Sequence, residues 1–108
     1  MNWEEELERE LKTGTLAEEQ GNHGRARVCA RRAVGCILGE LGRQRGVNPG
    51  NDVVKNLERF LQEEELPETV FKAGNRLRSR VRPDFSSSSE HPLDDARILI
   101  DHLRSLLS

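Results

Sequence analysis

The residues of this chain with the clearest potential for chemistry are the arginines that recur at every second position of GNRLRSRVRPDF, residues 74–85. A guanidinium carries several N–H donors in one plane, which suits it to binding phosphate or carboxylate groups. In an α-helix, however, each two-residue step turns by about 200°, so alternate positions do not share a face. The spacing alone therefore does not predict a single anion-binding clamp.

These four arginines divide into two pairs. Arg76 and Arg80 lie opposite the apolar stripe of the helix, where we expect their side chains to be solvated and open to an anion. The other two lie at the edge of the core, where a partly buried guanidinium needs an acceptor such as Asp84 or a glutamate of the first helix. The residues to which we assign a structural role are Arg78, Arg82, Pro83 and Asp84.

A second group of arginines lies in residues 25–45, mostly within RARVCARR. Two interpretations stay open. The acidic first helix, which begins EEELERE, neutralises these charges, or they present paired donors to a phosphate. The residues that we expect to bind an anion are Arg25, Arg27, Arg31, Arg76 and Arg80.

Candidates for catalysis are few. Arg97 and His102 in RILIDH form an Arg-x4-His pair, a match that chance supplies readily in a chain so rich in arginine. Their side chains would also lie about 140° apart around a helix. His23 stands in a GNHG turn without an evident partner, which is typical of a capping or exposed residue. We therefore assign no catalytic residue, with Arg97 and His102 as the only available pair.

The two cysteines, Cys29 and Cys36, lie seven residues apart in one helical stretch. A helix would separate them by about 10 Å, too far for a disulfide between them. We expect both to be small core residues. No further metal ligands stand nearby at suitable spacing, so we predict neither a metal site nor a cofactor.

Composition favours one domain, residues 1–108, with a heavily charged surface: hydrophobic residues make up 34% and charged residues 33%. The net charge of −2 conceals a segregation in which residues 22–82 are basic and both ends of the chain are acidic. Such a split indicates either neutralisation between packed helices or a basic face directed at a partner. No apolar run approaches the ~20 residues that span a bilayer. The acidic start is unlike a signal peptide, so we expect a cytoplasmic protein without membrane contact.

Apolar spacing predicts an all-α protein of five helices, four long and one short. The first runs to about residue 20, the second covers about 24–41, and the short third begins after an N-cap at Asn51 or Asp52. The fourth begins at Leu66-Pro67, and Pro92 opens the last. The many small residues of the second helix would let a neighbouring helix approach closely. For a dimer surface, the alanine-rich second helix and the fourth helix both stay open.

Several segments in this order resemble HEPN domains. AEEQGNHGRARVCARRAVGCILGEL resembles their Gly-Asn-type turn followed by an alanine-rich second helix, and RVRPDF is similar to an Arg-Tyr-Pro-Asp segment that ends the fourth helix. HPLDDARILIDHLRSLL follows at the family's spacing. The resemblance covers nearly the whole chain. It implies an up-and-down helical bundle that forms homodimers and is often encoded beside a minimal nucleotidyltransferase in prokaryotic toxin–antitoxin-like pairs.

Some HEPN domains are metal-independent ribonucleases with an Arg-x4–6-His motif, whereas others bind nucleotides or act as accessory subunits. At the corresponding place this chain reads Gly74-Asn75-Arg76-Leu77-Arg78-Ser79, without the motif's arginine and histidine. The Arg-Tyr-Pro-Asp segment becomes Val81-Arg82-Pro83-Asp84, and Asn51 replaces a histidine often found in the family.

The resemblance therefore implies a non-catalytic nucleotide-binding or accessory module, a homodimer with a nucleotidyltransferase as a further partner. The alternative is a ribonuclease with displaced catalytic residues. Because the chain has only Trp3 and three phenylalanines for base stacking, a small phosphate-bearing ligand or a protein partner is favoured over RNA.

Overall fold

The computed structural model describes residues 2–47, 50–79 and 90–107. These residues form five helices and no strand, which confirms the all-α prediction for the described part of the chain. The helices are α1 (Trp3–Glu19), α2 (His23–Gln44), α3 (Val53–Glu63), α4 (Glu68–Arg78) and α5 (Pro92–Leu106). None of the helices in these ranges is long and apolar enough to cross a membrane.

Local sequence signals set most helix ends. The side chains of Asn2, Asn22 and Asp52 cap the first three helices, each accepting a backbone N–H three residues later at 2.9, 3.2 and 3.1 Å. Asp52 is thus the N-cap of α3, one of the two residues predicted. After α1, Gly21 takes a positive φ of 75°, and the next N–H reaches back to the carbonyl of Ala17 at 2.8 Å. This is a Schellman ending, which favours glycine at the left-handed position.

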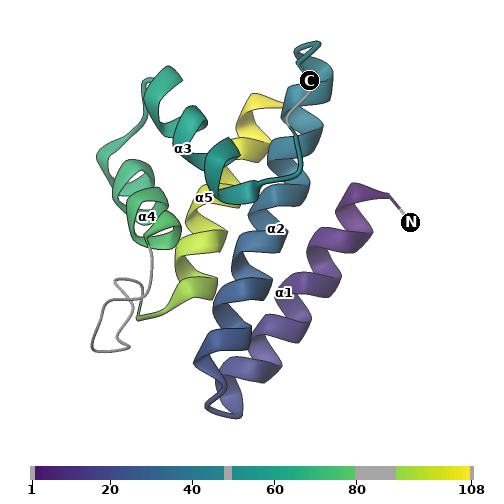
Figure 1. Ribbon diagram of the computed structural model, residues 1–108, viewed down its shortest axis with the longest axis vertical. Coiled ribbons are helices and arrows are strands. Elements are labelled where there is room, and N and C mark those ends of the chain that lie inside the picture. Colours follow the sequence, from purple (N-terminus) through teal and green to yellow (C-terminus); the bar gives the residue numbers. More distant parts are fainter. Residues whose placement is uncertain (1, 48–49, 80–89, 108) are drawn as a thin grey trace.

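Helix α2 is the centre of the bundle and contacts all four other helices. Figure 1 shows α1 running antiparallel along one side of α2, α3 and α4 on the other side, and α5 behind. Alanines on α2 let its neighbours pack closely. The largest fully buried side chains come from every helix: Leu7, Val34, Ile37, Leu57, Leu77, Leu93, Leu99 and Leu103.

Two expectations about the helices change. The prediction of four long helices and one short helix is not confirmed, because α3 and α4 have eleven residues each. The alanine-rich face of α2 is not a free dimer surface, since Ala26, Ala30 and Ala33 are completely buried within the chain itself.

Candidate anion site at the end of α4

The C-terminal end of α4 offers carbonyl oxygens that need donors. The helix ends at Arg78, and Ser79 is extended, with φ −68° and ψ 144°. The last carbonyls of a helix have no intrahelical partner and carry the negative end of the helix dipole. The Ser79 hydroxyl donates back to the carbonyl of Asn75 at 2.6 Å, so other groups must supply donors for the carbonyls of Leu77 and Ser79.

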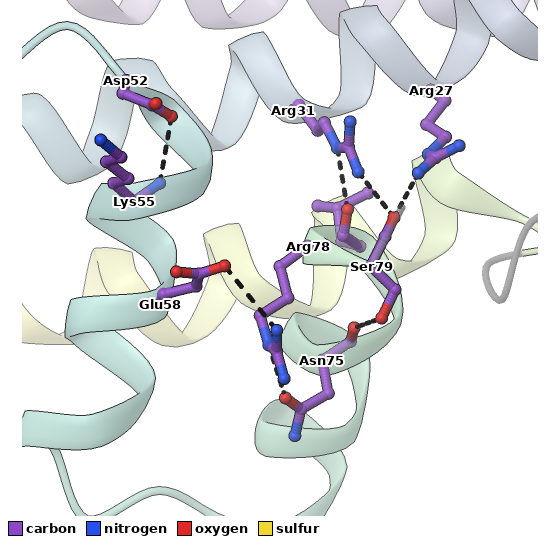
Figure 2. A network of polar contacts seen from close by, with 9 residues as sticks. Arg27, Arg31, Asp52, Lys55, Glu58, Asn75, Arg78 and Ser79 are labelled. Carbon is purple, nitrogen blue, oxygen red and sulfur yellow. Dashed lines mark hydrogen bonds and ion pairs between the residues drawn. The ribbon is translucent and has the colours of Figure 1, made fainter. Parts of the chain in front are cut away.

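Those donors come from two arginines of α2. Arg27 and Arg31 are four residues apart, so their side chains leave one face of the helix together. Arg31 donates from Nε to the carbonyl of Leu77 and from Nη2 to that of Ser79, both at 2.8 Å. Arg27 donates from Nη2 to the same Ser79 oxygen. Figure 2 shows the two guanidiniums reaching from α2 and converging on this one oxygen.

Within the described part of the chain, this pair of arginines has no carboxylate partner. Arg27 is only 7% exposed, and its Nε is buried with no hydrogen-bond partner. Burial lowers the pKa of both arginines. The positive charge of the neighbouring Arg27 lowers the pKa of Arg31 further. No described carboxylate pairs with either guanidinium. The arrangement caps α4 and leaves two adjacent positive charges that an anion would compensate.

Of the remaining predicted anion ligands, the structure describes Arg25 and Arg76. Arg25 is exposed in the first turn of α2 and pairs with no carboxylate in the described ranges. The expectation that Arg76 is solvated and free is wrong. Its Nη2 lies 2.7 Å from Oδ1 of Asp95, and its Nε lies 3.2 Å from both oxygens. Asp95 is 5% exposed, so this ion pair joins α4 to α5 at the edge of the core. Arg80 lies outside the described residues.

Of the arginines predicted to be structural, Arg78 is partly buried as expected but uses different acceptors. It donates to the side chain of Asn75 at 2.9 Å and lies 3.7 Å from Glu58 of α3, rather than pairing with a first-helix glutamate (Figure 2). A neighbouring helix thus supplies the acceptor. The other three members of this group, Arg82, Pro83 and Asp84, lie outside the described residues.

The hypothesis that the acidic α1 neutralises the arginines of residues 25–45 is also wrong for the two of them that form ion pairs in the described part of the chain. Arg43 pairs with Glu40 of its own helix at 3.0 Å, and Arg45 pairs with Glu64 after α3. Two glutamates of α1 instead face the last helix and its N-cap: Glu8 lies 3.5 Å from Arg104, and Glu18 lies 3.8 Å from His91.

The Arg-x4-His pair shows no catalytic geometry. Arg97 donates to the hydroxyl of Thr15 in α1 at 3.1 Å and lies 3.8 Å from Asp94. His102 is half-buried on the same helix, α5. Five residues along a helix separate its side chain from that of Arg97 by about 140° around the axis. Arg97 therefore engages α1 and its own helix rather than the histidine.

The expectation that both cysteines are core residues is confirmed for Cys29 alone. Both are free thiols, Cys29 buried and Cys36 half-buried. Burial raises the pKa of each thiol, and the negative charges of nearby glutamates raise it further. Neither thiol is therefore activated as a nucleophile. Among the described residues, no group of three or more histidine, cysteine or acidic side chains could hold a metal ion.

No family model matches the chain, and neither the curated proteins nor the solved structures include a significant match to it. The functional argument therefore depends on the chain's own geometry. Sequence reasoning missed Ser79 and Leu77, because their main-chain carbonyls are the acceptors and carry no residue signature. It also missed Asp95 as the partner of Arg76. The four-residue spacing of Arg27 and Arg31 was the one available signal.

Proposed function

We propose that this protein is a non-catalytic, HEPN-like binding or accessory module that binds a phosphate-bearing small molecule, such as a nucleotide. The proposed ligands are Arg27 and Arg31, with Arg25 at the exposed start of the same helix. Arg80 remains a proposed fourth contributor. Arg76 contributes less, because Asp95 already compensates its charge.

One observation carries this proposal: two guanidiniums meet at a single neutral oxygen, the Ser79 carbonyl, and no carboxylate among the described residues pairs with them. Like charges held this close repel one another, and burial removes the water that would screen them. A phosphate is the natural counter-charge, since it accepts several N–H bonds at once. Arg31 has only Nε and Nη2 engaged and keeps further donors on a half-buried side chain.

The proposed assembly and partner of the protein depend on the resemblance of the segments around α2 and the end of α4 to HEPN domains. We propose an up-and-down bundle that forms a homodimer in the prokaryotic cytoplasm and partners a minimal nucleotidyltransferase in a toxin–antitoxin-like pair. The all-helical architecture supports this proposal. The engagement of Arg97 with Thr15 and Asp94 favours binding over catalysis.

Ligand-induced stabilisation tests the proposed function. The unfolding temperature would be measured in inorganic phosphate, AMP and ATP, at low ionic strength because salt screens exposed charges. A ligand that binds only the folded state at 100 times its Kd adds about 2.7 kcal/mol of stability. We expect stabilisation of wild-type protein and of Arg59→Met, an exposed α3 arginine outside the site. An Arg27→Met/Arg31→Met protein that is stabilised equally would contradict the proposal.

A further inference from the structure

A groove of about 600 Å³ opens between α1, α2 and the start of α3, away from the arginine pair at the end of α4. Four residues of α1, five of α2 and four from residues 50–56 line it. Its volume falls within the ~300–1,000 Å³ typical of small-molecule sites. The groove is therefore large enough for a ligand of its own.

Glycines of α2 shape the floor of this groove. At Gly35 a Cβ would come within 2.6 Å of a methyl group of Val53, so glycine allows the first turn of α3 to approach α2. At Gly39 a Cβ would lie 3.6 Å from Nη1 of Arg43, so that guanidinium lies close over the helix. Gly35 and Gly39 thus form part of the groove floor, with Val53 and Arg43 packed close to them.

The charges along the groove are incompletely paired. Arg43 is held by Glu40, with both Nε and Nη2 donating to one carboxylate oxygen at 3.2 and 3.0 Å. Arg9 of α1 and Arg32 of α2 also line the groove, but neither pairs with a carboxylate in the described ranges. Two arginines on facing walls thus offer donors to an anion.

The groove also offers an acceptor and an aromatic ring. The carboxylate of Glu10 lies beside the thiol of Cys29, and its buried Oε2 has no hydrogen-bond partner among the described residues that meets the usual geometry. Trp3 is half-buried, with its ring 5.9 Å from the guanidinium of Arg104, and it also lines the groove. Cys36 faces Glu6 across the antiparallel helices, so Arg32 and Glu10 lie toward one end of the groove and Trp3 toward the other.

We propose that this groove binds a small aromatic anion. Its carboxylate or phosphate lies between Arg9 and Arg32, and its ring packs against Trp3, where aromatic pairs gain energy beyond burial. A polar N–H or O–H on the ligand would satisfy Glu10. This site is separate from the arginine pair at α4, so either can fail without the other.

Trp3 provides the assay, because it is the only tryptophan and the chain has no tyrosine. The protein would be titrated with benzoate and phenyl phosphate, with benzyl alcohol as the neutral ring and inorganic phosphate as the ringless anion. We expect a saturable change in Trp3 emission with an aromatic anion. The affinity for that anion should be at least about tenfold higher than for either control compound, because the loss of one charge-assisted contact has an effect of this size. The tighter of the two aromatic anions identifies the anionic group.

Three matched variants test the site. Arg9→Gln and Arg32→Gln should each weaken binding about tenfold, with unchanged helical content, because both side chains are exposed. Arg59→Gln, exposed on α3 but outside the groove, should bind as wild type. Amide NMR shifts of Gly35 and Gly39 would confirm the location. Absence of a saturable change in both emission and shifts, or equal weakening in Arg59→Gln, would overturn the proposal.

Discussion

Single replacements of Arg27 and Arg31 by methionine test how much each arginine contributes to the stability of the fold. We expect Arg31 to stabilise the folded state more than Arg27 does. Arg31 makes two hydrogen bonds to the end of α4, and bonds to charged groups are each worth about 1.5–3 kcal/mol before desolvation and repulsion are subtracted. We expect Arg31→Met to lower the free energy of unfolding by about 2 kcal/mol. For a domain of this size that corresponds to about 8 °C in unfolding temperature.

Arg27→Met should cost less, although Arg27 is the more buried side chain. Arg27 makes one hydrogen bond, to an oxygen that Arg31 also serves, and its buried Nε has no partner. Methionine fills the path of the aliphatic stem and removes a desolvated charge, and such replacements are often neutral. We expect a loss of about 1 kcal/mol or less.

The assay is urea unfolding followed by circular dichroism, with the exposed Arg25→Met as control, expected within about 0.5 kcal/mol of wild type. In the Arg31→Met background, Arg27 becomes the last side-chain donor to the Ser79 carbonyl among the described residues, so Arg27→Met should then cost about 1 kcal/mol more than it does alone. A larger loss from Arg27→Met than from Arg31→Met in the wild-type background would refute this reasoning.

Two further predictions concern packing and pH. Gly74→Ala should destabilise the protein by about 1–3 kcal/mol, because the new Cβ would lie 2.6 Å from a methyl group of buried Leu61. Gly24→Ala should stabilise it by up to about 1 kcal/mol, because a Cβ there would meet nothing within 4 Å. Equal urea midpoints for the two variants would contradict this prediction. The raised thiol pKa values of Cys29 and Cys36 mean that the unfolded chain loses these protons first as pH rises. Stability should therefore fall above about pH 8.5, through the range between the unfolded and folded pKa values, and a Cys29→Ala/Cys36→Ala protein unfolded in urea at about pH 7.5 and 9.5 should lose less. An identical decline in that variant would exclude the thiols as its cause.

Sequence predicted the helices well because their signals are local. Apolar spacing, the cap at Asp52 and the proline that opens α5 lie within a few residues of the ends they set. The length of α4 was harder to predict, since its apolar stripe continues beyond Arg78, where the helix ends.

Partner choice was the least predictable feature, because it depends on contacts distant in sequence. The charge pattern suggested that α2 arginines face the acidic α1, yet Arg27 and Arg31 contact residues about 50 positions later. Their acceptors are main-chain carbonyls, which every residue type carries. Asp95 could have been suspected as a partner, since it stands in the first turn of α5 beside buried Ala96 and must be paired if it faces the core.

The most direct test of the proposed function is a calorimetric titration of ATP into wild-type protein and into Arg27→Met/Arg31→Met, at low salt and in EDTA. The account predicts binding by the wild-type protein, at least about tenfold weaker binding by the folded double variant, and intact ATP recovered at the end. Equal affinities in the two proteins would contradict the assignment of this site.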